Sequence, residues 1–170
     1  KKKNEYSEKE LNDFINENKD QLKVEYLDFN YVIINPKNLV GSEEFDQSFF
    51  DKIDQIEIDI ANNIPIENIV SNFNLSLVKK MNLKFSSNLS EIEKKIFELK
   101  DNDYEIFEND NDYVLYQIKN KTEKIPDLSD NEIRDELLEL LFQKNKFEYN
   151  RILLEKIRDK KFNNNEFLKM

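Results

Sequence analysis

Carboxylates are the side chains of this sequence that are best suited to chemistry, because it contains no histidine and no cysteine. Histidine is the commonest general base and metal ligand, and cysteine supplies thiolate nucleophiles and soft metal ligands. Two Asp-Asn-Asp triplets, at 101–103 and 110–112, are similar to the opening of a calcium-binding loop. Both lack the central glycine and the terminal glutamate that such a loop needs. Because Asn and Asp also favour turns, we interpret both triplets as turns and expect no metal and no cofactor.

The remaining carboxylates do not select a catalytic pair. An acidic cluster near the start of the last predicted helix lies mostly off its apolar stripe, which is typical of a solvated face: Glu132, Asp135, Glu136 and Glu139. A hydrolase with two catalytic carboxylates stays open, since no spacing points to one pair. The single glycine cannot supply a phosphate-binding loop or a dinucleotide fingerprint, and no G-x-S-x-G motif is present. We therefore predict no catalytic residue.

Composition restricts the classes of partner. The net charge is −10, with 36% charged and 38% apolar residues, and no stripe of Lys and Arg with interleaved aromatics stands out. This balance argues against nucleic acid and against an anionic membrane surface as partners. The longest apolar runs have about four residues, where a transmembrane helix needs about twenty. We expect any export signal or anchor to lie outside these residues.

Hydrophobic periodicity predicts five helical segments. The first runs from Ser7 to about Gln21 and opens with a capping box formed by Ser7 and Glu10. A second capping box, Ser90 with Glu93, opens a shorter helix, and a third opens the last helix after Ser129. The apolar stripe of that last helix comprises Ile133, Leu137, Leu138, Leu141, Phe142, Phe147, Ile152, Leu153, Ile157 and Phe162. The predicted helices span about 7–21, 43–62, 66–73, 90–99 and 130–160.

Alternating apolar residues predict the strands between these helices. Residues 24–34 read as a buried strand that Asn35-Pro36 ends, and a loop over 35–44 holds Gly41. A short strand is expected near Val78 to Met81, and a hairpin over 104–107 and 113–118. A small antiparallel-type sheet with inserted helices is an α+β fold. We predict an N-terminal helical arm (1–22), a central domain (23–122) and a C-terminal helical arm (123–170).

The order of these segments resembles a parvulin-type (rotamase) peptidyl-prolyl cis-trans isomerase. "SEKELNDFINENKDQLK" followed by "YLDFNYVIINPK" is similar to the helix and first strand that open that domain. "FFDKIDQIEIDIANNIPIENIVSNFNLSL" resembles the family's inserted helices, and "LSEIEKKIFELKDNDYEIFENDNDYVLYQIKNKTEKIPDLSDNEIRDELLELL" resembles its close. The likeness covers nearly the whole chain in order and spacing. The arrangement of predicted segments most resembles that of periplasmic foldases of the SurA/PpiD type, in which such a domain is flanked by long chaperone helices.

The resemblance implies a peptide pocket but not the family's catalytic pattern. The family's two histidines fall on Tyr31 and Val114, and its glycine in the last strand falls on Asp112. Phe97 matches the pocket-facing "aaF" position, with Ile92 about one turn earlier. Isomerisation must twist an amide whose rotation barrier is about 18–20 kcal/mol, and lost histidines weaken a pocket built for that task. The peptide-binding residues that this likeness suggests are Tyr31, Ile92, Phe97, Leu115 and Tyr116.

Three functions follow from these patterns. The first is a chaperone-like folding factor that binds unfolded or proline-containing polypeptides and has weak or lost isomerase activity. The second is an active, divergent peptidyl-prolyl isomerase. The third is a segment of a larger protein that self-associates through its long C-terminal helix. The resemblance implies a periplasmic location, or a membrane anchor facing the periplasm.

Overall fold

The computed structural model describes residues 2–161, with side chains through residue 154. The chain divides into two compact units. One unit is the continuous segment Val24–Lys124, which holds the sheet. The other joins the N-terminal segment, through Lys23, to the C-terminal segment that begins at Ile125.

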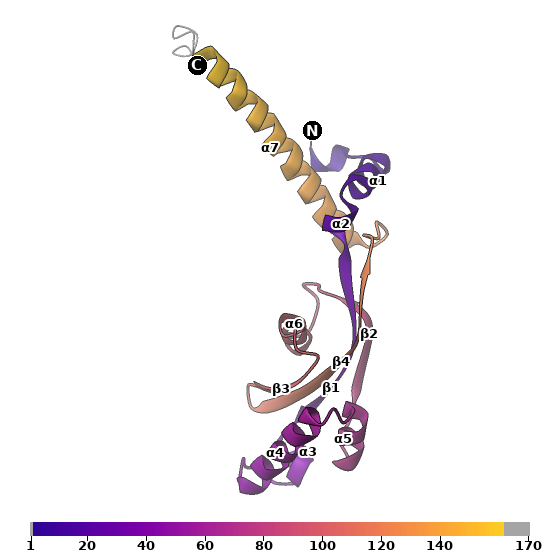
Figure 1. Cartoon of the computed structure of the whole chain (residues 1–170), viewed down its shortest axis with the longest axis vertical. Helices are drawn as coiled ribbons and strands as arrows, with labels where there is room; N and C mark the ends of the chain where they lie inside the picture. Colours follow the sequence, from indigo (N-terminus) through magenta and orange to yellow (C-terminus); the bar gives the residue numbers. More distant parts are fainter. Residues whose placement is uncertain (1, 162–170) are drawn as a thin grey trace. The chain divides into compact units, whose positions relative to one another are not determined.

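The first unit is built on a four-stranded antiparallel sheet in the order β2-β1-β4-β3 (Figure 1). Its first and last strands are therefore the two central ones. They are the longest strands, and both faces of the sheet are covered where they carry apolar residues, as a doubly buried strand requires. The strands are β1 (Val24–Ile34), β2 (Val78–Lys84), β3 (Tyr104–Asn109) and β4 (Asp112–Lys124).

The two central strands pair along their whole length. Val24 lies opposite Lys124 at one end of this ladder, and Ile34 lies opposite Tyr113 at the other. The register shifts once, between Asp28 and Phe29, where Lys119 of β4 has no partner residue on β1. This bulge separates the apolar half of the ladder from a more polar extension.

Helices cover both faces of this sheet (Figure 1). Helices α4 and α5 pack on the face that carries Val32, Ile34 and Leu115, and α6 packs on the face that carries Phe29 and Tyr116. Successive residues of a strand point to opposite faces, so Leu115 and Tyr116 belong to different cores. The inserted helices are α3 (Pro36–Val40), α4 (Gln47–Ala61), α5 (Ile66–Asn72) and α6 (Glu91–Glu98).

The segment predicted as a loop over 35–44 contains the short helix α3, so that prediction was wrong. Asn35 ends β1, but its side chain also accepts a hydrogen bond from the backbone N–H of Asn38 and caps the helix. Pro36 occupies the first helical position, where a missing N–H costs nothing. Gly41 ends the helix with φ 72°, a left-handed conformation that glycine adopts without strain. The next helix begins at Gln47 rather than near residue 43, because Asp46 caps it.

Other local signals are confirmed. Ser90 and Glu93 cap α6 reciprocally, and the predicted hairpin is formed by β3 and β4. The first Asp-Asn-Asp triplet lies in the turn after α6, and the second spans the hairpin turn. Strand β4 runs to Lys124, well past the predicted end at residue 118.

The second unit is helical. It contains the 3-10 turn η1 (Lys3–Glu5) and the helices α1 (Glu8–Glu17), α2 (Lys19–Leu22) and α7 (Asn131–Lys161). The capping box of Ser7 and Glu10 is confirmed. The first helix was expected to continue to residue 21, but Asn18 interrupts it. The last helix begins after Asp130, whose carboxylate accepts the N–H groups of Glu132 and Ile133, so the cap is Asp130 and not Ser129.

The N-terminal segment packs on the first half of α7. The side chains of Ile133, Leu137 and Leu141 are buried there, as are Leu11 and Phe14 of α1. Two ion pairs accompany this packing, Glu8 with Arg134 and Lys3 with Glu139. Farther along α7 the apolar side chains are exposed, namely Phe147, Tyr149, Ile152, Leu153 and Leu154. Two members of the predicted stripe, Ile157 and Phe162, lie outside the described side chains.

Candidate polypeptide-binding groove

Helix α6 supplies one wall of the candidate site. The Ser90 hydroxyl accepts the N–H of Glu93, and the Glu93 carboxylate accepts the N–H of Ser90 at 2.9 Å. Burial raises the pKa of Glu93, but these hydrogen bonds and Lys80, whose ammonium lies 3.7 Å away, outweigh it and lower the pKa overall. The charged carboxylate therefore fixes the helix start against β2. This anchoring orients Phe97 toward the sheet.

Four aromatic rings form a continuous series from the sheet to the surface. The rings of Tyr31 and Phe29 lie 6.3 Å apart between centroids, and Phe29 meets Phe97 edge-on at 6.3 Å. Phe97 in turn meets Phe85 at 6.0 Å with an interplanar angle of 73°. Edge-to-face pairs of this kind stabilise beyond simple burial, by about 0.5–1.5 kcal/mol each. The series therefore holds Phe85 near α6 even though it lies in the segment between β2 and α6.

The series ends in an open groove of about 390 Å³. Phe97 forms its base and is only 6% exposed, whereas Phe85 is 59% exposed. Lysine side chains can cover apolar surface with their methylene stems and keep the ammonium in water. The groove is therefore apolar at its base and charged at its rim. Its lining consists of Phe85, Lys94, Phe97, Glu98 and Lys100.

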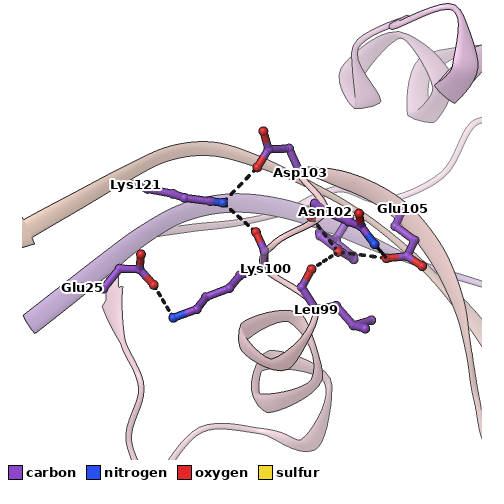
Figure 2. A network of polar contacts seen from close by, with 8 residues as sticks. Glu25, Leu99, Lys100, Asn102, Asp103, Glu105 and Lys121 are labelled. Carbon is purple, nitrogen blue, oxygen red and sulfur yellow. Dashed lines mark hydrogen bonds and ion pairs between the residues drawn. The ribbon is translucent and has the colours of Figure 1, made fainter.

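Polar contacts fix the end of α6 beside the groove, as Figure 2 shows. The Lys100 ammonium lies 2.5 Å from the Glu25 carboxylate. Lys121 donates to the backbone carbonyl of Lys100 at 2.6 Å and pairs with Asp103 at 3.1 Å. These contacts tie the turn after α6 to both central strands. They therefore connect this wall of the groove to the sheet.

Tyr116 anchors the same turn from inside the core. Its hydroxyl lies 3.0 Å from the carbonyl of Leu99, 2.8 Å from the carbonyl of Asn102 and 3.3 Å from the Glu105 carboxylate. Burial raises the pKa of Tyr116, and the nearby Glu105 carboxylate raises it further. The phenol therefore stays protonated and serves as a hydrogen-bond donor within the fold. Its side chain is fully buried, so it is not free to contact a peptide.

The structure brings four of the five predicted peptide-binding residues to one face. Tyr31, Ile92, Phe97 and Tyr116 all belong to the core beneath α6, and Tyr31 lies directly opposite Tyr116. Leu115 does not join them, because it points to the other face and packs with α4 and α5. Of these four, Phe97 lines the groove itself.

The lining also includes residues that the sequence did not reveal, namely Phe85, Lys94, Glu98 and Lys100. Phe85 was the only one with a signal, since it is a lone aromatic in the polar stretch "LKFSSNLS". The other three read as the solvated face of a helix and the turn after it. Their role depends on the position of Phe85, which sequence spacing does not define.

A second polar cluster holds α5 against the opposite face of the sheet. The Glu67 carboxylate accepts hydrogen bonds from Asn30 at 2.8 Å and from Lys119 at 3.0 Å. Burial raises the pKa of Glu67, but its own backbone N–H, Lys119 and Asn30 outweigh this, and the pKa is lowered overall. Gln117 accepts the backbone N–H of Ile66 at 3.1 Å. These contacts fix the start of α5 and are structural.

Within the residues that the structure describes, no cluster of three potential ligands could hold a metal ion. No helix in this part of the chain is long and apolar enough to cross a membrane. No protein-family model, curated protein or solved structure matches the chain.

Proposed function

We propose that this protein is a chaperone-like folding factor that binds unfolded polypeptides on a parvulin-like scaffold with weak or lost isomerase activity. The observation that carries the proposal concerns Phe97. The likeness of sequence assigns this residue to the pocket helix, and the structure places it at the base of an open apolar groove. The ring of Phe85 beside it packs edge-on against Phe97 with one side and leaves 59% of its surface exposed.

The order of elements supports the same proposal. The first strand is followed by an insert of three helices (α3, α4 and α5), the strand β2, the helix α6 and a closing hairpin, with helices on either side in sequence. Apart from the short helix α3, this is the order that the resemblance implies. The sheet places the first and last strands side by side, so residues from both contribute to the face beneath α6.

The residues at the two histidine positions support weak or lost catalysis. Tyr31 and Val114 come from adjacent strands and the same face, with Val114 two residues from the partner of Tyr31. A pair of polar side chains at these positions could therefore act on one substrate. Val114 has no hydrogen-bonding side chain and is fully buried. Only Tyr31 could contribute a polar group. One hydrogen bond lowers only a small part of the barrier to rotation about the peptide bond, which is about 18–20 kcal/mol.

The groove suits one apolar or aromatic side chain, or a proline ring, of an extended polypeptide. Burying such a side chain contributes about 1.5–3 kcal/mol, which gives weak and rapidly reversible binding. Lys94 and Glu98 at the rim would stay in contact with solvent and tolerate many flanking sequences, while Lys100 remains paired with Glu25. Weak binding with little sequence preference is what a folding factor needs, because its clients are unfolded chains of many kinds.

The test compares a groove variant with a matched surface variant in the full chain. Phe85→Ser removes the exposed wall of the groove, and Ile58→Ser removes a similarly exposed apolar side chain on α4. Both are assayed for suppression of aggregation of a chemically unfolded client protein. We expect Phe85→Ser to lose most of the suppression and Ile58→Ser to retain it. Equal activity in both variants, or no suppression by the parent chain, would contradict the proposal.

The runner-up function, an active isomerase, is tested on the same proteins with short X–Pro peptides at high protein concentration. Acceleration that is lost in Tyr31→Phe would favour the enzyme over the pure binder.

Self-association is favoured by a separate observation, the exposed apolar residues in the second half of α7. Sedimentation at increasing concentration tests it directly. A periplasmic location is part of the proposal and rests on the resemblance of sequence.

A further inference from the structure

A second cavity lies where the start of α4 meets the β3–β4 hairpin. Four aromatic rings gather there, from Phe45, Phe49, Phe50 and Tyr113. Phe45 packs edge-on against Phe49 at 5.0 Å, and its ring centroid lies 6.3 Å from those of Phe50 and Tyr113. Phe49 is buried and anchors the cluster to the core, while Phe45 and Phe50 are 43% and 38% exposed. The rings of Phe45 and Phe50 are therefore accessible to a group that enters the cavity.

The rim of this cavity is acidic. The cavity has a volume of about 190 Å³, which is enough for one long side chain and too small for a large ligand. Its lining combines Phe45, Phe50 and Tyr113 with Glu108, Asp110, Asn111 and Asp112. Lysine and arginine are absent from this set of lining residues. The lysine nearby on α4, Lys52, is directed elsewhere, since it donates to the carbonyl of Leu39 and lies over the ring of Phe73.

The hairpin holds the acidic groups in fixed positions. Glu108 lies directly opposite Tyr113, and Asn109 lies opposite Asp112, so carboxylates project from both strands beside the turn. The Tyr113 hydroxyl donates to the Glu108 carboxylate at 3.2 Å. Burial raises the pKa of Tyr113, and the negative charges of Glu108 and Glu57 raise it further. The site therefore carries a negative potential around neutral aromatic rings.

We propose that this cavity binds the cationic side chain of a lysine or arginine presented by a polypeptide. A cation within about 6 Å of an aromatic centroid is attracted by the negative face of the ring. Carboxylates at the rim add charge-assisted hydrogen bonds to the ammonium or guanidinium group. The methylene stem of the same side chain would lie along Phe45 and Phe50. An uncharged apolar side chain would gain nothing from the negative charges of Glu108 and Asp112.

This site is separate from the groove beside α6. Tyr113 packs with the core beneath α4 and α5, whereas Phe97 packs with the core beneath α6 on the other face of the sheet. The inference therefore does not rest on the chaperone proposal. If both proposals hold, the protein would bind a client at two places, taking an apolar side chain of the client in the groove and a basic side chain of the client in the cavity.

The experiment is a titration of the full, isotopically labelled chain with a short peptide of alternating lysine and glycine, followed by NMR. A second peptide carries acetylated lysines and a third carries arginines. We expect saturable shifts of the amide signals of Phe45, Phe50 and Tyr113 with the lysine and arginine peptides. The acetylated peptide should bind at least about tenfold more weakly, since it offers no cation. Comparable binding of the acetylated peptide would overturn the proposal.

Because the net charge is −10, the variants must separate this cavity from a general attraction to basic peptides. Glu108→Gln with Asp112→Asn removes two rim charges, and Asp135→Asn with Glu136→Gln removes two exposed charges on α7. We expect the first pair to weaken binding about tenfold and the second less than about twofold. Phe45→Leu keeps an apolar side chain but removes a ring face, and should weaken binding about fivefold. Equal effects of the two charge pairs, or no effect of Phe45→Leu in a folded protein, would overturn the inference.

Discussion

The hydroxyl of Tyr116, in the middle of the sheet, reaches 2.8 Å to the backbone carbonyl of Asn102, in the turn that leaves α6. A phenol has one hydrogen to donate, yet the same oxygen also lies 3.0 Å from the carbonyl of Leu99. This shared donor joins the end of a helix to the strand beneath it. The wall of the groove beside α6 thus depends on a side chain that does not itself line it.

Replacing Tyr116 with Phe should lower the free energy of unfolding by about 1–2 kcal/mol, because partly buried carbonyls lose their donor. Urea denaturation with a constant m-value measures the loss. Tyr149→Phe is the matched control, since that side chain is exposed on α7 and should change stability by less than about 0.5 kcal/mol. Equal stability of the two variants would show that the hydroxyl of Tyr116 contributes nothing.

The pairing of β1 with β2 shifts register between Leu27 and Phe29, and the contact between Asp28 and Asn82 should stabilise this irregular pairing. The Asp28 carboxylate accepts the backbone N–H of Asn82 at 2.7 Å, and Asn82 has φ 52°. Asp28→Ala removes this partner and should cost about 1 kcal/mol, whereas Asn82→Gly keeps the hydrogen bond and relieves the left-handed backbone. Thermal unfolding of both variants measures the two effects. An Asp28→Ala variant as stable as the parent protein would contradict the predicted role of the contact.

Gly41→Ala should destabilise the protein by about 1–2 kcal/mol through backbone strain alone. Gly41 has φ 72°, and a Cβ placed there would meet no atom within 4 Å. Asn tolerates this conformation better than Ala, so Gly41→Asn should cost less. Denaturant midpoints of the two variants give the comparison, and the reverse order would argue against strain as the cause.

Part of the stability should depend on ionisation of Glu67. Its pKa is lowered from the usual 4.5 in the folded protein, so its contribution is present above about pH 4.5 and is lost as the pH falls through the lower, folded value. Glu67→Gln should therefore reduce stability at pH 7 but have less effect at pH 3. The difference should be below about 1 kcal/mol, since the side chain is partly exposed to solvent. Denaturation across this pH range, with the exposed Glu136→Gln as control, measures it, and parallel curves would rule the effect out.

The sequence predicted those elements whose signals are local. Ser7 and Ser90 each precede a Glu at the third position, which determines where α1 and α6 begin. Strand β1 was predicted with its observed bounds because its apolar residues alternate and then run together. The α+β class follows from this order of helices and strands.

The errors occurred where one signal has two structural meanings. Asn35-Pro36 ends a strand, but Asn as a cap and Pro in the first turn also begin a helix, and the second meaning was missed. Strand β4 extends beyond residue 118 because its partner is the polar start of β1, a long-range pairing that no local pattern reveals. Leu115 was grouped with Tyr116 although neighbouring residues of a strand face opposite sides. The groove itself depends on Phe85, which only the three-dimensional arrangement brings to Phe97.

The pairing of β1 with β4 also determines the order in which the protein can form during its synthesis. Strand β1 ends at Ile34, and its central partner does not begin until Asp112. At ordinary rates of translation, the ribosome needs on the order of ten seconds to make the segment between them. Until then the apolar residues of β1 have only the edge strand β2 as a partner in the sheet. The nascent chain of a protein proposed to protect unfolded polypeptides therefore passes through a stage in which it needs such protection itself.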